Sequence, residues 1–201
     1  MTFEQMVIEM KARGFTHMGA RCEQYLNDAY LLDICEEEDW PFLEATKSGT
    51  TPLEITDLRT IEYVVDDTQV EKLHPLVQAR ITDDWNPDLT EVGTPELYYV
   101  TEGKKVNVFP TSTTDEITVT YWKVPTELSG TEEPLLPTRY HSLIVDGAVA
   151  RAYENSDDYE LANVAKGRFD SRLNAMRDSL MNMQHDAPDD YVVVSDPGAM
   201  R

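Results

Sequence analysis

The sequence predicts an α+β protein: an antiparallel helical bundle of two N-terminal and two C-terminal helices, with a central β-rich insert and an extended C-terminal tail. Two observations support this fold class. Apolar residues recur at helical spacing towards both ends of the 201-residue chain, and its centre holds short β-prone runs bounded by Gly, Thr and Asp. The expected segments are the N-terminal helices (1–40), the insert (41–125), the C-terminal helices (126–185) and the tail (186–201).

Two helices are expected before the insert. Thr2 and Gln5 fit a capping box that opens the first helix, and Gly14 is suited to end it. The second helix is expected over residues 19–37. Its apolar stripe consists of Cys22, Tyr25, Leu26, Ala29 and Leu32. Cys22 and Cys35 lack the paired short spacings of metal ligands, so we expect two buried, free thiols in a reducing compartment.

The insert is expected to consist mainly of strands. The stretch "PELYYVTEGKKVNVFP" (95–110) has the pattern of a β-hairpin, with Glu102 and Gly103 in the turn because glycine accepts a positive φ. The stretch "EITVTYWKVP" (116–125) predicts a further strand. Before the hairpin, the stretch "HPLVQARITDDW" (74–85) predicts a short helix with Pro75 near its start.

The C-terminal helices are expected to pack as an antiparallel pair. Thr138 is placed to cap the first, and Ser156 or Asp157 to cap the second. The stripe of the first is Tyr140, Leu143, Ile144, Gly147 and Ala148, and that of the second is Ala162, Ala165, Phe169, Leu173, Met176, Leu180 and Met183.

The net charge of −21 is unevenly distributed. Residues 139–184 carry six bases and seven acids, whereas residues 1–138 carry ten bases and 27 acids. An acidic surface repels the phosphates of nucleic acid and keeps a protein soluble. The C-terminal helices are thus nearly neutral, and the acidity lies in the rest of the chain.

No catalytic, cofactor-binding or metal-binding residue is expected. Asp84 to Asp88 begins like a calcium loop, but Leu89 stands where glycine is required and Pro95 where glutamate is required. Sequence-adjacent acid pairs in polar loops do not provide two carboxyl groups across a cleft. His141 is expected to pack in a helix interface rather than to act as a base, and Ser142 lacks the glycines of a nucleophile elbow.

The tail holds one β-prone island in an acidic, proline-bracketed stretch. This island consists of Tyr191, Val192, Val193 and Val194. Four residues cannot fold alone, but they can add a strand to the edge of a partner's sheet. We therefore expect the island to dock onto a partner protein.

Three stretches in order resemble the head-to-tail adaptor (connector, or head-completion) proteins of tailed bacteriophages. They are "DLRTIEYVVDD", "GTPELYYVTEGKKVNVFP" and "ITVTYWKVPTEL" followed by "EEPLLPTRYHSLIVDGAVARAY", within about residues 57–180. The resemblance implies a homo-oligomeric ring of twelve subunits in the neck of the virion. Such a ring binds the portal protein on one side and a tail or stopper protein on the other, and it extends the DNA channel. With the resemblance, the island becomes the expected portal-docking segment. In such a ring we expect the nearly neutral C-terminal helices to make the contacts between subunits and the acidic insert to face the channel or an outer rim. The residues expected at the subunit interface are Tyr140, His141, Ile144, Phe169 and Leu173.

Two alternatives remain open. One is a virion-associated acidic hydrolase that uses paired carboxylates, and the other is a different neck ring, a stopper or a tail terminator. No run approaches 18 apolar residues, so no membrane partner is expected. Double-stranded DNA is expected to pass through the ring without specific binding. The expected location is the host cytoplasm during assembly and then the virion, below the portal vertex.

Overall fold

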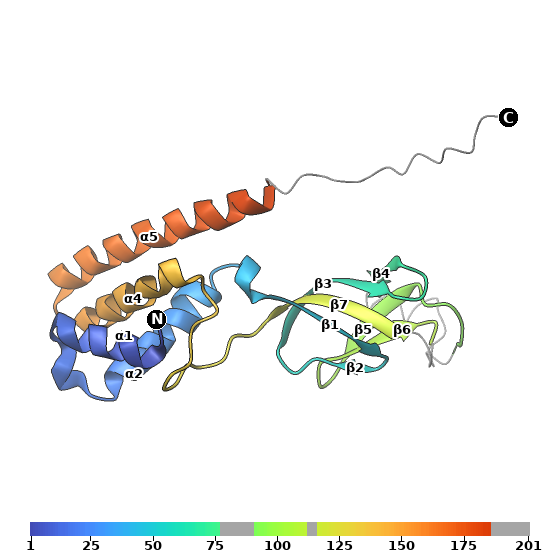
Figure 1. Ribbon diagram of the computed structural model, residues 1–201, viewed down its shortest axis with the longest axis horizontal. Helices are drawn as coiled ribbons and strands as arrows, with labels where there is room; N and C mark the ends of the chain where they lie inside the picture. Colours follow the sequence, from blue (N-terminus) through green and yellow to red (C-terminus); the bar gives the residue numbers. More distant parts are fainter. Residues whose placement is uncertain (77–90, 112–115, 186–201) are drawn as a thin grey trace.

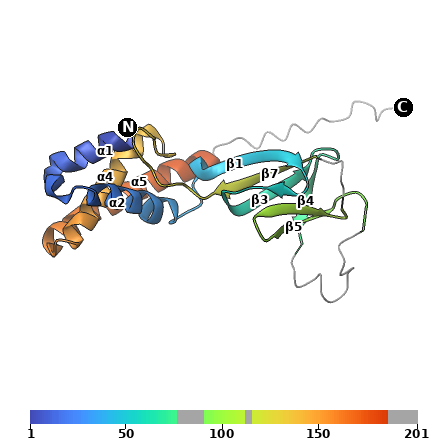
Figure 2. The same ribbon diagram turned by 90° about the horizontal axis from the view of Figure 1, so that it is seen from below.

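A computed structural model describes residues 1–76, 91–111 and 116–185. The helices and the strands form two parts that lie end to end along the long axis of the molecule (Figures 1 and 2). The helices are α1 (Phe3–Met10), α2 (Arg21–Asp28), α4 (His141–Glu154) and α5 (Tyr159–His185). The strands are β1 (Glu44–Thr50), β2 (Leu53–Glu54), β3 (Leu58–Asp66), β4 (Glu71–Pro75), β5 (Leu97–Thr101), β6 (Lys105–Phe109) and β7 (Glu116–Lys123).

The first helix begins as the sequence predicts. The backbone N–H of Gln5 donates to Thr2 Oγ1 at 3.4 Å, and the backbone N–H of Thr2 donates to Gln5 Oε1 at 3.0 Å, so the capping box is confirmed. A π-helical turn, η1 (Lys11–Phe15), follows α1 and contains Gly14 at φ +107°. Glycine adopts this angle without strain, so it turns the chain where the sequence predicts the helix to end.

The second predicted helix is shorter than expected as an α-helix. Regular α-helix covers only Arg21–Asp28, and the chain continues as a π-helical segment, η3 (Ala29–Cys35). After η3 the chain reaches Trp40, whose backbone is extended at φ −71° and ψ 141°, as a residue before proline prefers. A single 3-10 turn, η4 (Pro41–Leu43), then leads directly into β1.

Seven strands form one sheet in the order β1-β7-β3-β4-β5-β6-β2. The neighbours pair antiparallel except β4 and β5, which are parallel. The outer strands β1 and β2 approach each other, since Lys47 Nζ donates to the carbonyl oxygen of Glu54 at 2.7 Å. The sheet is therefore a nearly closed barrel, and it has its own core of Leu53, Ile55, Leu58, Val64, Leu73, Val106, Val108, Ile117, Val119 and Tyr121.

Two of the predicted β segments are confirmed, and one predicted helix is corrected. The hairpin of β5 and β6 turns at Gly103, which has φ +82°, and β7 covers most of the predicted strand 116–125. Pro75, however, is the last residue of strand β4 and does not open a helix. The remainder of that predicted helix, from residue 77, and the calcium-like stretch from Asp84 lie outside the described residues.

The predicted fold class, an antiparallel bundle of two N-terminal and two C-terminal helices carrying an insert, is wrong. The central strands build a seven-stranded, nearly closed, barrel-like sheet with an independent core. The N-terminal helices α1 and α2 have eight residues each and are followed by π-helical turns, so they are not the two long helices that a regular bundle requires. The fold combines this sheet with short N-terminal helices and the C-terminal pair α4 and α5.

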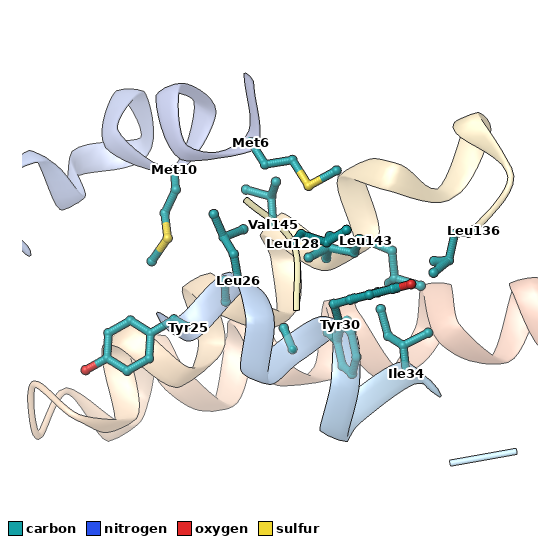
Figure 3. Close-up of a cluster of buried hydrophobic side chains, with 14 of the residues drawn as sticks. Met6, Met10, Tyr25, Leu26, Tyr30, Ile34, Leu128, Leu136, Leu143 and Val145 are labelled. Carbon is teal, nitrogen blue, oxygen red and sulfur yellow. The ribbon is translucent and has the colours of Figure 1, made fainter. Parts of the chain in front are cut away.

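The helices of both chain ends share one apolar core, with α4 at its centre (Figure 3). Nearly every residue of α4 from His141 to Ala150 is buried, because α1, α2, η3 and α5 all contact it. Figure 3 shows side chains from these elements meeting, including Met6 from α1, Leu26 from α2 and Leu143 from α4. Leu128 and Leu136 join them from the connection between β7 and α4.

The caps of the C-terminal helices differ from the predicted ones. A 3-10 turn, η5 (Thr138–Tyr140), precedes α4, so the N-cap positions are Pro137 for η5 and Tyr140 for α4, and neither makes a side-chain capping hydrogen bond. At the start of α5 the acceptor is Asp158, whose Oδ1 receives the backbone N–H of Leu161 at 3.3 Å. Asp157 has φ +57°, so it occupies the left-handed position that ends α4. The break between the helices lies where the sequence predicts it.

Candidate assembly surfaces

Four of the five residues predicted at a subunit interface are buried within the single chain. His141, Ile144, Phe169 and Leu173 expose 2%, 0%, 6% and 7% of their surface. Tyr140 is half-buried and keeps an accessible ring, over which the Arg139 guanidinium lies at 4.7 Å from the ring centre. These five residues lie on η5, α4 and α5. Of the five, Tyr140 is the one with enough exposed surface to contact a second molecule.

His141 is a packing residue, as the sequence predicts. Its Nε2 lies 2.8 Å from the carbonyl oxygen of Leu136, which only accepts hydrogen bonds, so Nε2 carries a proton and donates. Its Nδ1 lies 3.0 Å from the carbonyl oxygen of Met1. The ring therefore joins the start of α4 to the connection from β7 and to the chain segment before α1.

A salt-bridge network centred on Asp146 was not found by sequence reasoning. Asp146 is 3% exposed, and its two carboxylate oxygens accept from Arg13 of η1, at 2.6 Å, and from Arg172 of α5. Arg172 also donates to Ser142 Oγ at 2.7 Å, and Arg13 also pairs with Glu9. The one signal in the sequence is a single acid inside the apolar run of residues 143–150. The network fixes three distant segments relative to one another.

A groove of about 370 Å³ runs between η3, α4 and α5. Its floor includes Gly147, Ala150 and Phe169. Across it, Arg151 makes a bidentate pair with Asp33, with both nitrogen–oxygen distances at 2.6 Å. Its remaining charged lining consists of Glu37, Glu154, Lys166 and Asp170. Acids outnumber bases, so the groove fits a partner with a basic edge better than a second acidic chain.

The floor of this groove depends on a close approach at Gly147. A Cβ at Gly147 would lie 3.0 Å from Ala29 Cβ and 3.0 Å from Phe169 Cε2. The glycine therefore allows α4 to contact η3 and α5 at the same position along its axis. Gly167 on α5 is the natural comparison, because a Cβ there would meet nothing within 4 Å.

Gly147→Ala is expected to lower the free energy of unfolding by about 2 kcal/mol relative to Gly167→Ala, because only the first alanine overpacks the core. Both alanines gain the same helix propensity, about 1 kcal/mol, so the difference isolates packing. Urea denaturation followed by circular dichroism measures both variants. Equal stabilisation of the two would contradict the close approach.

The helical part and the sheet are joined by two fixed connections. At the first, Arg59 of β3 donates to the carbonyl oxygens of Cys35 at 2.9 Å and Glu36 at 3.3 Å. In the second, which runs from β7 to η5, the carbonyl oxygens of Glu132 and Gly130 accept from the first two N–H groups of α1 at 2.8 Å and 2.9 Å. These bonds satisfy helix-end donors that otherwise lack partners.

A second hollow, of about 460 Å³, lies at this junction. Its lining is largely apolar and includes Leu31, Leu32, Cys35, Val124 and Pro125, with Glu36 and Arg59 as the charged members. Arg59 is already engaged by the backbone of η3 and by Asp39, at 3.7 Å. The hollow therefore has little free positive charge.

Both cysteines are free and buried, as predicted. Burial raises the pKa of the Cys35 thiol to about 12, and burial also raises the pKa of the Cys22 thiol. A raised pKa leaves little thiolate at neutral pH, so neither side chain is a nucleophile there. Both act as small apolar residues of the helical core.

The predicted docking island, Tyr191 to Val194, lies outside the described residues. The helix that precedes it, α5, is tied to the segment after η3, since Arg177 forms ion pairs with Glu37, at 3.5 Å, and with Glu38. Among the described residues, no helix combines the length and the apolar composition needed to cross a bilayer.

The described residues form an elongated chain with two cores, one of helices and one of strands. The family model described as SU10 adaptor protein matches residues 14–193. The chain belongs to this family, and the resemblance to phage head-to-tail adaptors is confirmed. No curated protein matches the chain.

Family membership supplies the coarse function. The chain is a structural adaptor protein of a bacteriophage and a component of the virion, where it interacts with other virion proteins at the head–tail junction. A structural adaptor family implies a role other than catalysis.

Proposed function

We propose that this chain forms a ring of twelve identical subunits in the phage neck, which connects the portal to the tail and extends the DNA channel. The observation that carries the proposal is the match of residues 14–193 to the adaptor family. Its functional segments are those expected from the sequence: helices in 1–40 and 126–185, a strand-rich segment in 41–125, and a docking tail in 186–201.

The nearly neutral C-terminal helices make the contacts between subunits in this proposal. Tyr140 meets the neighbouring subunit directly, and His141, Ile144, Phe169 and Leu173 support that surface from the core beneath it. The outer side of α5 adds apolar surface, because Leu161 and Val164 are 46% and 72% exposed. Exposed apolar side chains near a neutral surface favour association of like subunits.

The acidic strand-rich segment faces the channel or the outer rim of the ring. Excess carboxylates repel DNA phosphates, so DNA passes without specific binding. This arrangement separates the two tasks of the chain. The helices hold the ring together, and the sheet faces either the DNA in the channel or the surroundings of the outer rim.

The ring is tested by mixing the purified chain with portal protein and imaging the product by electron microscopy. We expect rings with twelve copies stacked on the portal. A chain that stays monomeric and ignores portal would contradict the proposal, and activity on a cell-wall glycan would favour a hydrolase instead. Binding to a tail tube but not to portal would identify a stopper or tail terminator.

Tyr191, Val192, Val193 and Val194 dock on the portal in this proposal. Deletion of residues 186–201 is expected to abolish attachment to portal, because each docking strand is short and the ring multiplies its loss. Sedimentation of portal with the truncated chain measures attachment, and circular dichroism confirms that the rest stays folded. Substitution of Asp189 and Asp190 by Asn leaves the island intact and serves as the control. Undiminished attachment after deletion would refute the assignment.

A further inference from the structure

The hairpin that joins β3 to β4 has a strained valine at its tip. Val70 has φ +56° and is 81% exposed. A β-branched residue at positive φ is a genuine outlier, because its Cβ crowds the backbone, and glycine or asparagine adopts this angle far more readily. An apolar side chain in water gives the chain no compensating burial. The stability of the chain itself therefore does not explain a valine at this position.

The surrounding hairpin holds this valine in a fixed place. The backbone N–H of Val70 donates to the carbonyl oxygen of Asp66 at 2.7 Å, and that of Thr68 donates to Asp66 Oδ1 at 2.9 Å. Asp66 is fully buried, although burial of a carboxylate is itself unfavourable. Asp67 accepts from Thr118 Oγ1 of β7 at 2.7 Å. Backbone strain that is over-determined in this way clusters at binding sites.

The tip lies at the end of the sheet farthest from the helices. Strand β1 enters from the helical part at Glu44, which pairs with Trp122, whereas Asp66 pairs with Ile117 near the other end of β7. Figures 1 and 2 show the β3–β4 end of the sheet pointing away from α1, α2, α4 and α5. A fixed apolar side chain at the extremity of an elongated molecule is placed to contact a different protein.

The charges near the tip indicate what that protein presents. Asp67 and Glu71 flank the tip, and Glu116 begins the adjacent strand β7; all three are exposed acids, whereas the nearby Lys72 lies over the Tyr63 ring, 4.4 Å from its centre. A second copy of this chain fits less well, since acids outnumber bases in the groove between η3, α4 and α5, where Lys166 is the base besides the paired Arg151, and Arg59 at the other hollow is also engaged. Complementarity therefore favours a small apolar pocket edged by Lys or Arg.

We propose that residues 67–71, the hairpin knob, insert Val70 into such a pocket on the tail-side protein that joins the adaptor. This inference rests on the proposed function, which assigns portal docking to residues 186–201 and leaves the far end of the sheet for the tail. A knob that is already fixed loses little conformational freedom on binding, because the cost of holding Val70 in this conformation is met when the chain folds.

The experiment complements a phage that lacks this gene with wild-type, Val70→Gly or Val70→Asn chain. Mass spectrometry counts copies of the chain per capsid, and electron microscopy counts the fraction of those capsids that carry a tail. Both variants are expected to load normally and to lower the tailed fraction at least tenfold, because loss of one buried valine already corresponds to about tenfold in affinity and the ring repeats it. Both are also expected to raise Tm by about 2–4 °C.

Two controls bracket the result. Val70→Ile retains a β-branched apolar side chain and is expected to keep the tailed fraction, whereas Val92→Ser removes another valine, 80% exposed, and should change nothing. Normal tailing with Val70→Gly would overturn the inference and leave the proposed function intact. Poor loading of that variant would place the tip on the head side or between subunits, against the inference. Absence of the wild-type chain from capsids would overturn the proposed function itself.

Discussion

Trp40→Ala is expected to lower the free energy of unfolding by about 3–5 kcal/mol, the range for removal of a buried aromatic side chain. Trp40 is fully buried and lies where the helical part passes into β1. Its Nε1 donates to the carbonyl oxygen of Ile34 at 2.5 Å, which gives the π-helical segment η3 a partner for one of its last carbonyl groups. Its ring stacks on Phe42, with centroids 5.8 Å apart.

Urea denaturation measures the effect, and two further variants separate the contribution of the hydrogen bond from that of the aromatic packing. Trp40→Phe keeps the apolar ring but leaves the Ile34 carbonyl oxygen without its donor, so we expect a smaller loss of about 1–3 kcal/mol. Phe42→Ala removes the stacked partner, which is only partly buried. Its loss of unfolding free energy is expected to lie between those of Trp40→Phe and Trp40→Ala. A loss below 1 kcal/mol for Trp40→Ala would show that this side chain does not join the two parts.

The sequence predicts best what is decided by neighbouring residues. The capping box at Thr2, the turn at Gly103 and the burial of Phe169, Leu173 and their helical neighbours all follow from side chains a few positions apart. The same holds for Cys22 and Cys35, whose spacing lacks the short pairs of a metal site. Local signals of this kind therefore place many elements correctly even where the fold class is wrong.

The fold class depends on pairings that local signals do not carry. Strand β1 reads "EATKSGT", a mostly exposed and polar stretch without alternation, yet it pairs along its whole length with β7, from Glu44 with Trp122 to Thr50 with Glu116. The sheet nearly closes because β1 pairs with β7 at one edge, whereas β2, which follows β1 directly in the chain, pairs with β6 at the other edge. The π-helical segments after α1 and α2 likewise follow from tertiary packing, because nothing in "AYLLDIC" separates it from ordinary α-helix.

An apolar stripe also does not say which surface covers it. Ile144 and Phe169 lie on apolar stripes of helices that are predicted to meet other subunits because they are nearly neutral. The structure shows both side chains buried in the helical core of their own chain, and their part in a subunit interface stays a prediction. The exposed valine Val70 is not predicted from the sequence. Its positive φ has no sequence signal, because turn rules expect Gly or Asn at such a position. Assembly surfaces are therefore the least predictable feature of this chain.

The salt-bridge network at Asp146 leads to a second large effect. Asp146→Ala is expected to lower the free energy of unfolding by about 3 kcal/mol, because two guanidinium groups lose the buried carboxylate that neutralises them. Arg13 and Arg172 are 29% and 34% exposed, so water recovers part of the loss and the effect stays at the lower end of the range for buried pairs. Tm should fall by about 6–12 °C, and thermal melting measures it.

A set of substitutions separates charge from packing. Asp170→Ala removes an exposed acid from α5 and is expected to change stability by less than about 0.5 kcal/mol. Asp146→Leu combined with Arg13→Met and Arg172→Met replaces the whole network by apolar groups and is expected to recover much of the stability lost by Asp146→Ala, since no charge is then left uncompensated. A triple variant less stable than Asp146→Ala would contradict this expectation. The ion pairs would then contribute to stability directly, beyond fixing the relative positions of η1, α4 and α5.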